Sequence, residues 1–187
     1  MEVKEIINGC LEDRPGAWTM LVQSYAEKIF NTAYQFTGNR AEAEDQTQEI
    51  FLKVFHSLRT FDKERNFDAW LLTMAKNHLI DAYRRTRWEK RNRDDFEEAV
   101  SRTAGPFSNP EDSLASRQDR ALLWKGLNGL PPDMRMAVIL KDIQGKAYED
   151  VAEIMKLPVG TVKSRVSRAK LRLAGLLRRA EEQGHAL

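Results

Sequence analysis

Apolar residues recur along this chain at steps of three and four, the period of amphipathic helices. In the first half, the pattern predicts helices over residues 3–11, from Pro15 to about Thr37, from 40 to about Arg59, and over 67–91. Gly38 stands where a helix C-terminus favours glycine, and Asn39 and Asn66 stand where a helix N-terminus favours a short polar side chain. The chain is therefore expected to be all-α.

The second half continues the helical pattern after a break. Asn109-Pro110 predicts the start of one helix, Gly129-Leu130-Pro131-Pro132 ends it, and another helix is expected from Met134 to Ile143. Residues 148–173 then give two helices joined by a tight corner at Lys156-Leu157. Pro158 follows this corner, at a position suited to the first turn of the second helix.

The last of these helices has one narrow apolar stripe and an otherwise basic surface. Between Lys156 and Arg179 there are eight Lys or Arg and no Asp or Glu. Small serines with cations around them suit a helix that enters a DNA major groove, because the serines allow close approach and the cations meet base edges and phosphates. The pattern favours a helix-turn-helix over a solvated basic helix on an ordinary bundle. The candidate contacts are Lys163, Ser164, Arg165, Ser167, Arg168 and Arg172.

The run LPVGTVKSRVSRAKLRL resembles the last helix-turn-helix of extracytoplasmic-function (ECF) sigma factors, in the sigma-70 family of bacterial RNA polymerase sigma factors. The resemblance implies that these six residues recognise the −35 element of a promoter. One position departs from the family, which usually has Ser or Thr where Ala147 stands. Losing that helix cap typically costs about 1 kcal/mol, and we expect Asp150 to compensate partly through the helix dipole.

Acidic residues gather in the early turns of the helix that follows Asn39. Acids near a helix N-terminus are often placed there by the helix dipole alone. However, EDQTQEIFLKVFHSLRTF resembles the sigma segment that binds the clamp coiled coil in the largest subunit of RNA polymerase. The resemblance implies a docking role for Asp45, Gln48, Glu49 and Leu52, with Lys53 and His56 as weaker candidates.

The next helix contains FDAWLLTMAKNHLIDAYRR, which resembles the sigma segment that melts and reads the −10 element. Holding open DNA requires pockets for flipped bases and cations along the phosphates. The resemblance assigns these roles to Phe61, Asn77, Arg84, Arg85 and Arg87. Trp70 is expected in the core, and His78 with Asp81 is expected to be a surface pair.

Charge and composition divide the chain into parts. The net charge is +2 overall, but residues 1–100 carry 15 basic and 18 acidic side chains, and residues 101–187 carry 15 and 10. Residues 94–109 are acidic at first and then contain the breaks Gly105-Pro106 and Ser108-Asn109, which predicts a flexible linker. Two small helical domains are therefore expected, at 1–93 and 110–180, followed by a tail at 181–187. The resemblance to sigma factors implies that the first corresponds to sigma region 2 and the second to sigma region 4.

The sequence offers no catalytic or metal-binding set. Three histidines are scattered, Cys10 is the one cysteine, and glycine-rich phosphate loops and nucleophile elbows are absent. We predict a protein that is not an enzyme and that needs no cofactor or metal. The lack of a signal pattern or an apolar run of membrane length, together with a single cysteine, fits the cytoplasm.

The resemblance also implies partners. These are core RNA polymerase, through the clamp of the largest subunit and the flap of the second-largest, promoter DNA, and an anti-sigma factor, which in this family is often membrane-bound. On its own the protein is expected to be a monomer. The alternative is a dimeric helix-turn-helix regulator that binds duplex DNA alone, which requires a self-association or effector domain within residues 1–100.

Overall fold

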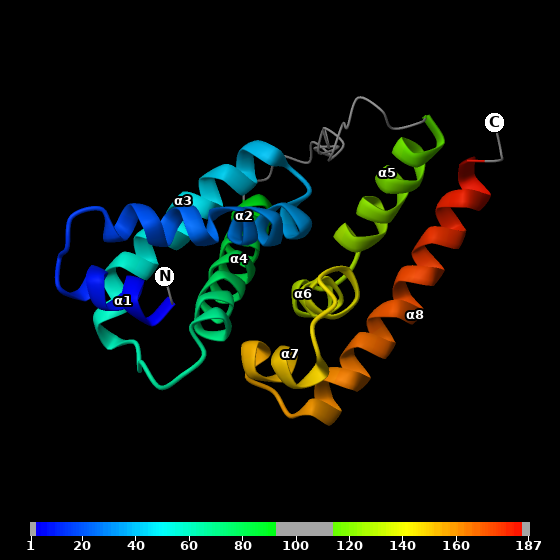
Figure 1. Cartoon of the computed structure of the whole chain (residues 1–187). Helices are drawn as coiled ribbons and strands as arrows, with labels where there is room; N and C mark the ends of the chain where they lie inside the picture. The colour runs from blue at the N-terminus through cyan, green and yellow to red at the C-terminus, as the bar shows by residue number, and fades with distance from the viewer. Residues whose placement is uncertain (1–2, 93–113, 185–187) are drawn as a thin grey trace.

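The computed structural model describes residues 3–92 and 114–184 (Figure 1). These residues form α-helices and no strand, which confirms the all-α prediction. The helices are α1 (Val3–Leu11), α2 (Ala17–Thr37), α3 (Arg40–Ser57), α4 (Phe67–Asn92), α5 (Leu114–Asn128), α6 (Pro132–Val138), α7 (Tyr148–Met155) and α8 (Val159–Gly184). A 3₁₀ turn over Leu58–Thr60 follows α3, and a π-helical turn over Ile139–Ile143 follows α6. The predicted linker at 94–109 lies outside the described residues.

The N-terminal bundle (α1–α4, residues 3–92) packs around a core in which Leu21, Ile29, Ile50 and Leu72 are at most 1% exposed. Its helix ends follow the sequence signals. Gly38 adopts φ 72°, and its N–H bonds to Tyr34 O at the end of α2. The side chains of Asn39 and Asn66 accept backbone N–H groups at the starts of α3 and α4. The start predicted at Pro15 was two residues early, because α2 begins after the left-handed Gly16.

The C-terminal bundle (α5–α8, residues 114–184) contains the predicted helix-turn-helix. Lys156 turns the chain between α7 and α8 with φ 54°, and α8 begins directly after Pro158. Val162, Val166 and Ala169 are buried, as the apolar stripe predicted. The helix expected from Met134 to Ile143 begins earlier, at Pro132, and its last turn widens into the π turn.

The two bundles share one hydrophobic core. A single cluster of buried residues runs from Leu71 and Ala75 on α4 to Met136 and Ile139 near α6 and on to Ile154 on α7. In Figure 1, α7 lies beside α4, while α5 and α8 run next to each other on the far side. Because interfaces between separate domains are normally smaller and more polar, this continuous core indicates that the bundles form one packed body in this structure.

Two expectations about single residues were wrong. His78 was expected at the surface, but it is 4% exposed and its Nε2 lies 3.5 Å from Glu49 Oε2. The helical period of α3 places Phe55 on the same apolar face as Ile50 and Val54, but Phe55 is 52% exposed. Trp70 is partly buried and packs against the core, as predicted. The sequence pattern missed the first two because the neighbouring helix, and not the period alone, decides which flank of a helix is covered.

Candidate nucleic-acid interface

The outer face of α8 presents a basic surface to solvent. Lys163, Ser164 and Ser167 are exposed, as are Arg168 and Arg172, whereas Arg165 is partly buried. The buried stripe of Val162, Val166 and Ala169 fixes the opposite side of the helix against its bundle. The sequence therefore sorts the helix correctly into an inner apolar stripe and an outer polar face.

Contacts within the helix-turn-helix hold part of this surface in place. Arg168 donates to the backbone carbonyl and hydroxyl of Ser164, both at 3.3 Å, which directs its guanidinium along the exposed face. The Lys163 ammonium lies 5.5 Å from the centre of the Tyr148 ring, and the Lys141 ammonium lies 4.6 Å from the same ring. A guanidinium and an ammonium displayed in this way suit base edges and phosphates respectively.

The C-terminal half of α4 is a second basic surface. Arg84, Arg85 and Arg87 are exposed, and Trp88 among them is 66% exposed. Arg87 donates to the Tyr83 hydroxyl at 2.9 Å. Arg84 reaches the C-terminal bundle, where its guanidinium lies 3.0 Å from Asp133 Oδ2.

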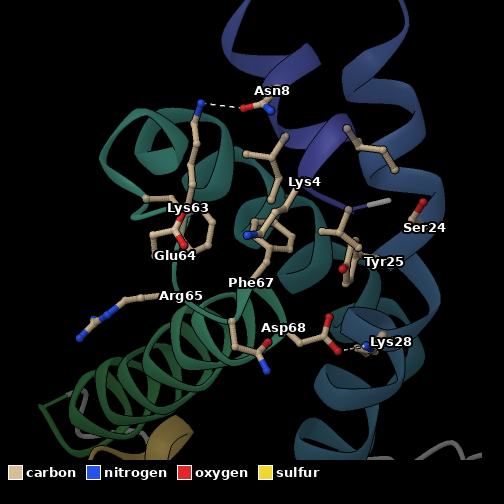
Figure 2. A pocket seen from close by; sticks show the side chains of 15 residues that line it. Lys4, Asn8, Ser24, Tyr25, Lys28, Lys63, Glu64, Arg65, Phe67 and Asp68 are labelled. Atoms are coloured by element: carbon tan, nitrogen blue, oxygen red, sulfur yellow. Dashed lines mark hydrogen bonds and ion pairs between the residues drawn. The ribbon is translucent and has the colours of Figure 1, made fainter. Parts of the chain in front are cut away.

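The loop over residues 61–66 borders a cavity of about 720 Å³ between α1, α2 and the start of α4 (Figure 2). In Figure 2, Lys63 reaches Asn8 and Lys28 reaches Asp68, each at 2.6 Å, while Arg65 points away from the hollow. Phe61 forms part of the wall and is 7% exposed, because it packs against Phe67 and Trp70. Aromatic rings with cations nearby are the groups that hold single-stranded bases.

The structure does not bring Phe61 and Asn77 into one pocket. Asn77 is exposed and lines a different hollow of about 220 Å³, together with Trp70 and Met74 of α4 and Glu153 and Lys156 of the C-terminal bundle. The two candidate −10 residues therefore line different hollows, although Arg65 and Asn66 border both.

A face of α3 combines acids with exposed apolar groups. Asp45, Gln48 and Glu49 are exposed, and Leu52 is 60% exposed. Phe55 lies one turn further on and packs against Trp18 at 4.8 Å between ring centroids. The sequence did not suggest Phe55 as a docking residue, although its position three residues after Leu52 places it on the same helix face. Large exposed apolar side chains with acids beside them are typical of a docking site for a basic amphipathic partner.

Metal sites and membrane-spanning helices are not found in the part of the chain that the structure describes. No three His, Cys, Asp or Glu side chains gather there as metal ligands. Over the same residues, no helix has both the length and the hydropathy that crossing a bilayer requires.

Comparison with known proteins accounts for both bundles. The family described as Sigma-70 region 2 matches residues 21–89, and the family described as Sigma-70, region 4 matches residues 120–173. The ECF RNA polymerase sigma-E factor of Escherichia coli is 33% identical over 161 residues, which are 82% of this chain and 83% of that protein. The RNA polymerase sigma-H factor of Pseudomonas aeruginosa is 33% identical over 159 residues, covering 82% of each chain. The ECF sigma factor SigE of Mycolicibacterium smegmatis is also 33% identical, but the chain spans only 62% of that longer protein.

Solved structures show the same fold. RpoE of Bartonella quintana in complex with the anti-sigma factor NepR aligns with a TM-score of 0.68 at 30% identity, covering 87% of this chain and 98% of that one. CnrH in complex with the cytosolic domain of CnrY aligns with a TM-score of 0.67 at 23% identity, covering 94% and 97% of the two chains. The fold and the basic surfaces thus define a sigma factor. The chain belongs to the ECF group of the sigma-70 family.

Members of this family are transcription initiation factors and not enzymes, which confirms the prediction that this protein is not an enzyme. The membership also confirms the main prediction, an alternative sigma factor for promoter-specific initiation. A solitary helix-turn-helix regulator does not account for the region 2 match over residues 21–89.

Proposed function

We propose that this protein docks on the clamp of the largest polymerase subunit through α3 and reads both promoter elements with the residues described above. The observation that carries the proposal is the order of surfaces along one chain. An acidic and apolar face on α3, a basic end on α4 and a basic outer face on α8 follow one another within the two matched regions.

The docking face consists of Asp45, Gln48, Glu49 and Leu52, and Phe55 extends it. The exposed Leu52 and Phe55 supply the apolar centre of the contact, and the acids beside them select a basic partner helix. Such a division fits the usual anatomy of interfaces, in which a few apolar anchors carry most of the binding energy. Lys53 and His56 border the same face.

Promoter reading is divided between the bundles. In the N-terminal bundle, Arg84, Arg85 and Arg87 hold the phosphates of the −10 region, while Asn77 and the pocket wall at Phe61 receive bases. In the C-terminal bundle, Arg168 reads bases of the −35 element, and Lys163, Arg165 and Arg172 flank it on phosphates. Ser164 and Ser167 allow α8 to approach the groove closely. The Sigma-70, region 4 match supports this assignment.

Further partners are proposed on the same grounds. In the solved structures named above, RpoE is bound to the anti-sigma factor NepR, and CnrH is bound to the cytosolic domain of CnrY. We therefore propose that an anti-sigma factor covers both bundles of this protein. Anti-sigma factors in this family are often membrane-bound. The flap of the second-largest polymerase subunit is the proposed contact of the C-terminal bundle. The free protein is proposed to be a cytoplasmic monomer.

The docking assignment is tested with the double substitution Asp45→Arg and Glu49→Arg. It should abolish binding to core RNA polymerase in a pull-down while leaving the circular dichroism spectrum unchanged, because both side chains are exposed. A matched control carries the same charge change at the exposed Glu5 and Glu12 near α1 and should bind normally. Retained binding by the Asp45 and Glu49 variant would refute the docking assignment.

A further inference from the structure

Leu171 is the most exposed large apolar side chain in the part of the chain that the structure describes. It is 72% exposed on α8, whereas Leu173 and Leu176 of the same helix are partly buried and pack against the bundle. Single exposed apolar side chains are common on protein surfaces, so exposure alone assigns Leu171 no role. What separates Leu171 from such cases is the helix face on which it lies.

Leu171 shares a face of α8 with three of the candidate −35 residues. It follows Ser164 by seven residues, Ser167 by four and Arg168 by three, which are the spacings that place side chains on one helix face. At about 100° per residue, its direction falls between those of Ser167 and Arg168. All three neighbours are exposed. Leu171 therefore lies in the middle of the surface that faces the major groove in the proposed function, on which the inference below rests.

Little of the described chain covers this leucine. Arg168 is directed away from it, because the guanidinium donates to the hydroxyl and the backbone carbonyl of Ser164, one turn earlier. The next turn on the same face carries the exposed Ala174 and Gly175, where an added Cβ atom would meet nothing within 4 Å. The Leu171 side chain is thus free to contact a molecule that approaches this face of α8.

The surroundings of Leu171 favour DNA over protein as its partner. Residues 156–179 hold eight cations and no acid, and Leu171 is the one large apolar side chain that is exposed between residues 159 and 179. The centre of a protein interface is normally built from several apolar side chains and is poor in charge. In the major groove, by contrast, the C5 methyl group of thymine is an apolar patch among polar base edges, and apolar side chains recognise it.

The spacing along α8 sets which base pair Leu171 can reach. Three residues rise about 4.5 Å along an α-helix, and base pairs follow one another at about 3.4 Å. Long side chains on a helix point toward its N-terminus, so Arg168 and Leu171 reach back along α8 in the same direction. Leu171 therefore faces a base pair beside the one that Arg168 reads.

We propose that Leu171 is a specificity-determining residue that contacts the C5 methyl group of a thymine in the −35 element, beside the base pair read by Arg168. The contact removes the methyl group and part of the leucine from water and forms no hydrogen bond. It therefore selects a T·A pair through the methyl group alone. Burial of one methyl group corresponds to about a fourfold preference for thymine over a base that lacks it.

The test measures the affinity of the holoenzyme, formed from this protein and core RNA polymerase, for a promoter fragment located by run-off transcription. Each thymine of the −35 element is replaced in turn by deoxyuridine, which pairs as thymine does but lacks the methyl group. At one position the wild type should lose about fourfold in affinity, and the Leu171→Ala variant should bind both fragments equally. Leu123→Ala is the matched control, because Leu123 is an exposed leucine of α5, and it should keep the wild-type ratio.

Three results would overturn the assignment of Leu171. They are a −35 element without thymine, a wild-type affinity that deoxyuridine leaves unchanged at every position, and an equal loss for the wild type and the Leu171→Ala variant. If Leu171→Ala instead weakens assembly with core polymerase and keeps the wild-type ratio, the leucine contacts protein and the assignment is also wrong.

Arg168→Ala in the same assay separates this assignment from the proposed function. If that variant loses discrimination at the −35 element while deoxyuridine has no effect on the wild type, α8 reads DNA and only the role of Leu171 fails. If neither change affects −35 discrimination, the proposed reading of the −35 element by α8 fails as well.

Discussion

The carboxylate of Asp150 accepts a hydrogen bond from the backbone N–H of Ala147 at 3.3 Å. The helix-turn-helix is therefore capped from within the first turn of α7. The sequence suggested that Asp150 would compensate for the missing cap through the helix dipole, and the structure adds this direct hydrogen bond. The complementary bond, from a side chain at position 147 to the N–H of residue 150, has no acceptor because alanine stands there.

Substituting Ala147 by serine should supply that acceptor. The backbone at Ala147 is already extended, with φ −63° and ψ 153°, as a helix cap requires. Ala147→Ser should therefore raise the free energy of unfolding by about 1 kcal/mol, measured by urea denaturation with circular dichroism. Ala147→Val keeps the backbone hydrogen bond to Asp150 and adds no hydroxyl, so it serves as the control. Equal stabilities for the serine variant and the wild type would contradict this account of the cap.

Buried His78 should make stability depend on pH. Burial foremost, and then Lys53, lower the pKa of His78 below its usual 6.5, although Glu49 opposes the shift. The folded state binds the proton less readily than the unfolded state. The contribution of neutral His78 to the free energy of unfolding is therefore fully present above about pH 6.5 and is lost as pH falls toward the lower folded-state pKa.

Replacing His78 by glutamine should flatten this part of the stability profile. The measurement is the urea midpoint at a series of pH values between neutral and mildly acidic. His56→Gln is the control, since His56 is exposed and its loss should leave the profile unchanged. If the wild type and the His78→Gln variant lose stability in parallel as pH falls, another group is responsible.

Arg168→Ala should weaken promoter use mainly by losing discrimination at the −35 element. A bidentate contact with a base is worth about 1–3 kcal/mol of discrimination, measured as the ratio of initiation rates on promoters with matched and altered −35 elements. Arg179→Ala, at the far exposed end of α8, is the matched control and should keep the ratio. Equal loss on every promoter variant would show that Arg168 contacts phosphate only.

Helix ends and the buried faces of helices could be predicted from the sequence, because they depend on residues that are neighbours along the chain. Gly38, Asn39 and Asn66 mark helix ends where the structure has them, and the stripe through Val162 and Val166 faces inward. These signals are local, since a cap or a period is set within one or two turns. The family resemblance then supplied the roles of the surfaces, which no local signal carries.

Contacts between helices that are distant in sequence could not be predicted from the sequence. Arg135 carries no sequence mark that distinguishes it from a surface arginine, yet it is 2% exposed because Phe36, Tyr83 and Asn128 surround it. Phe55 shows the reverse, since a helical period places it inward, whereas in the structure it packs against Trp18 and is still 52% exposed.

Run-off transcription tests the central claim most directly. Purified protein is added to sigma-free core RNA polymerase with a pool of genomic DNA fragments, and the transcripts are sequenced. The account predicts initiation at a limited set of sites that share two spaced sequence elements, and loss of those transcripts with the Asp45→Arg and Glu49→Arg variant. Transcripts that match those of core polymerase alone, in number and in start sites, would contradict it.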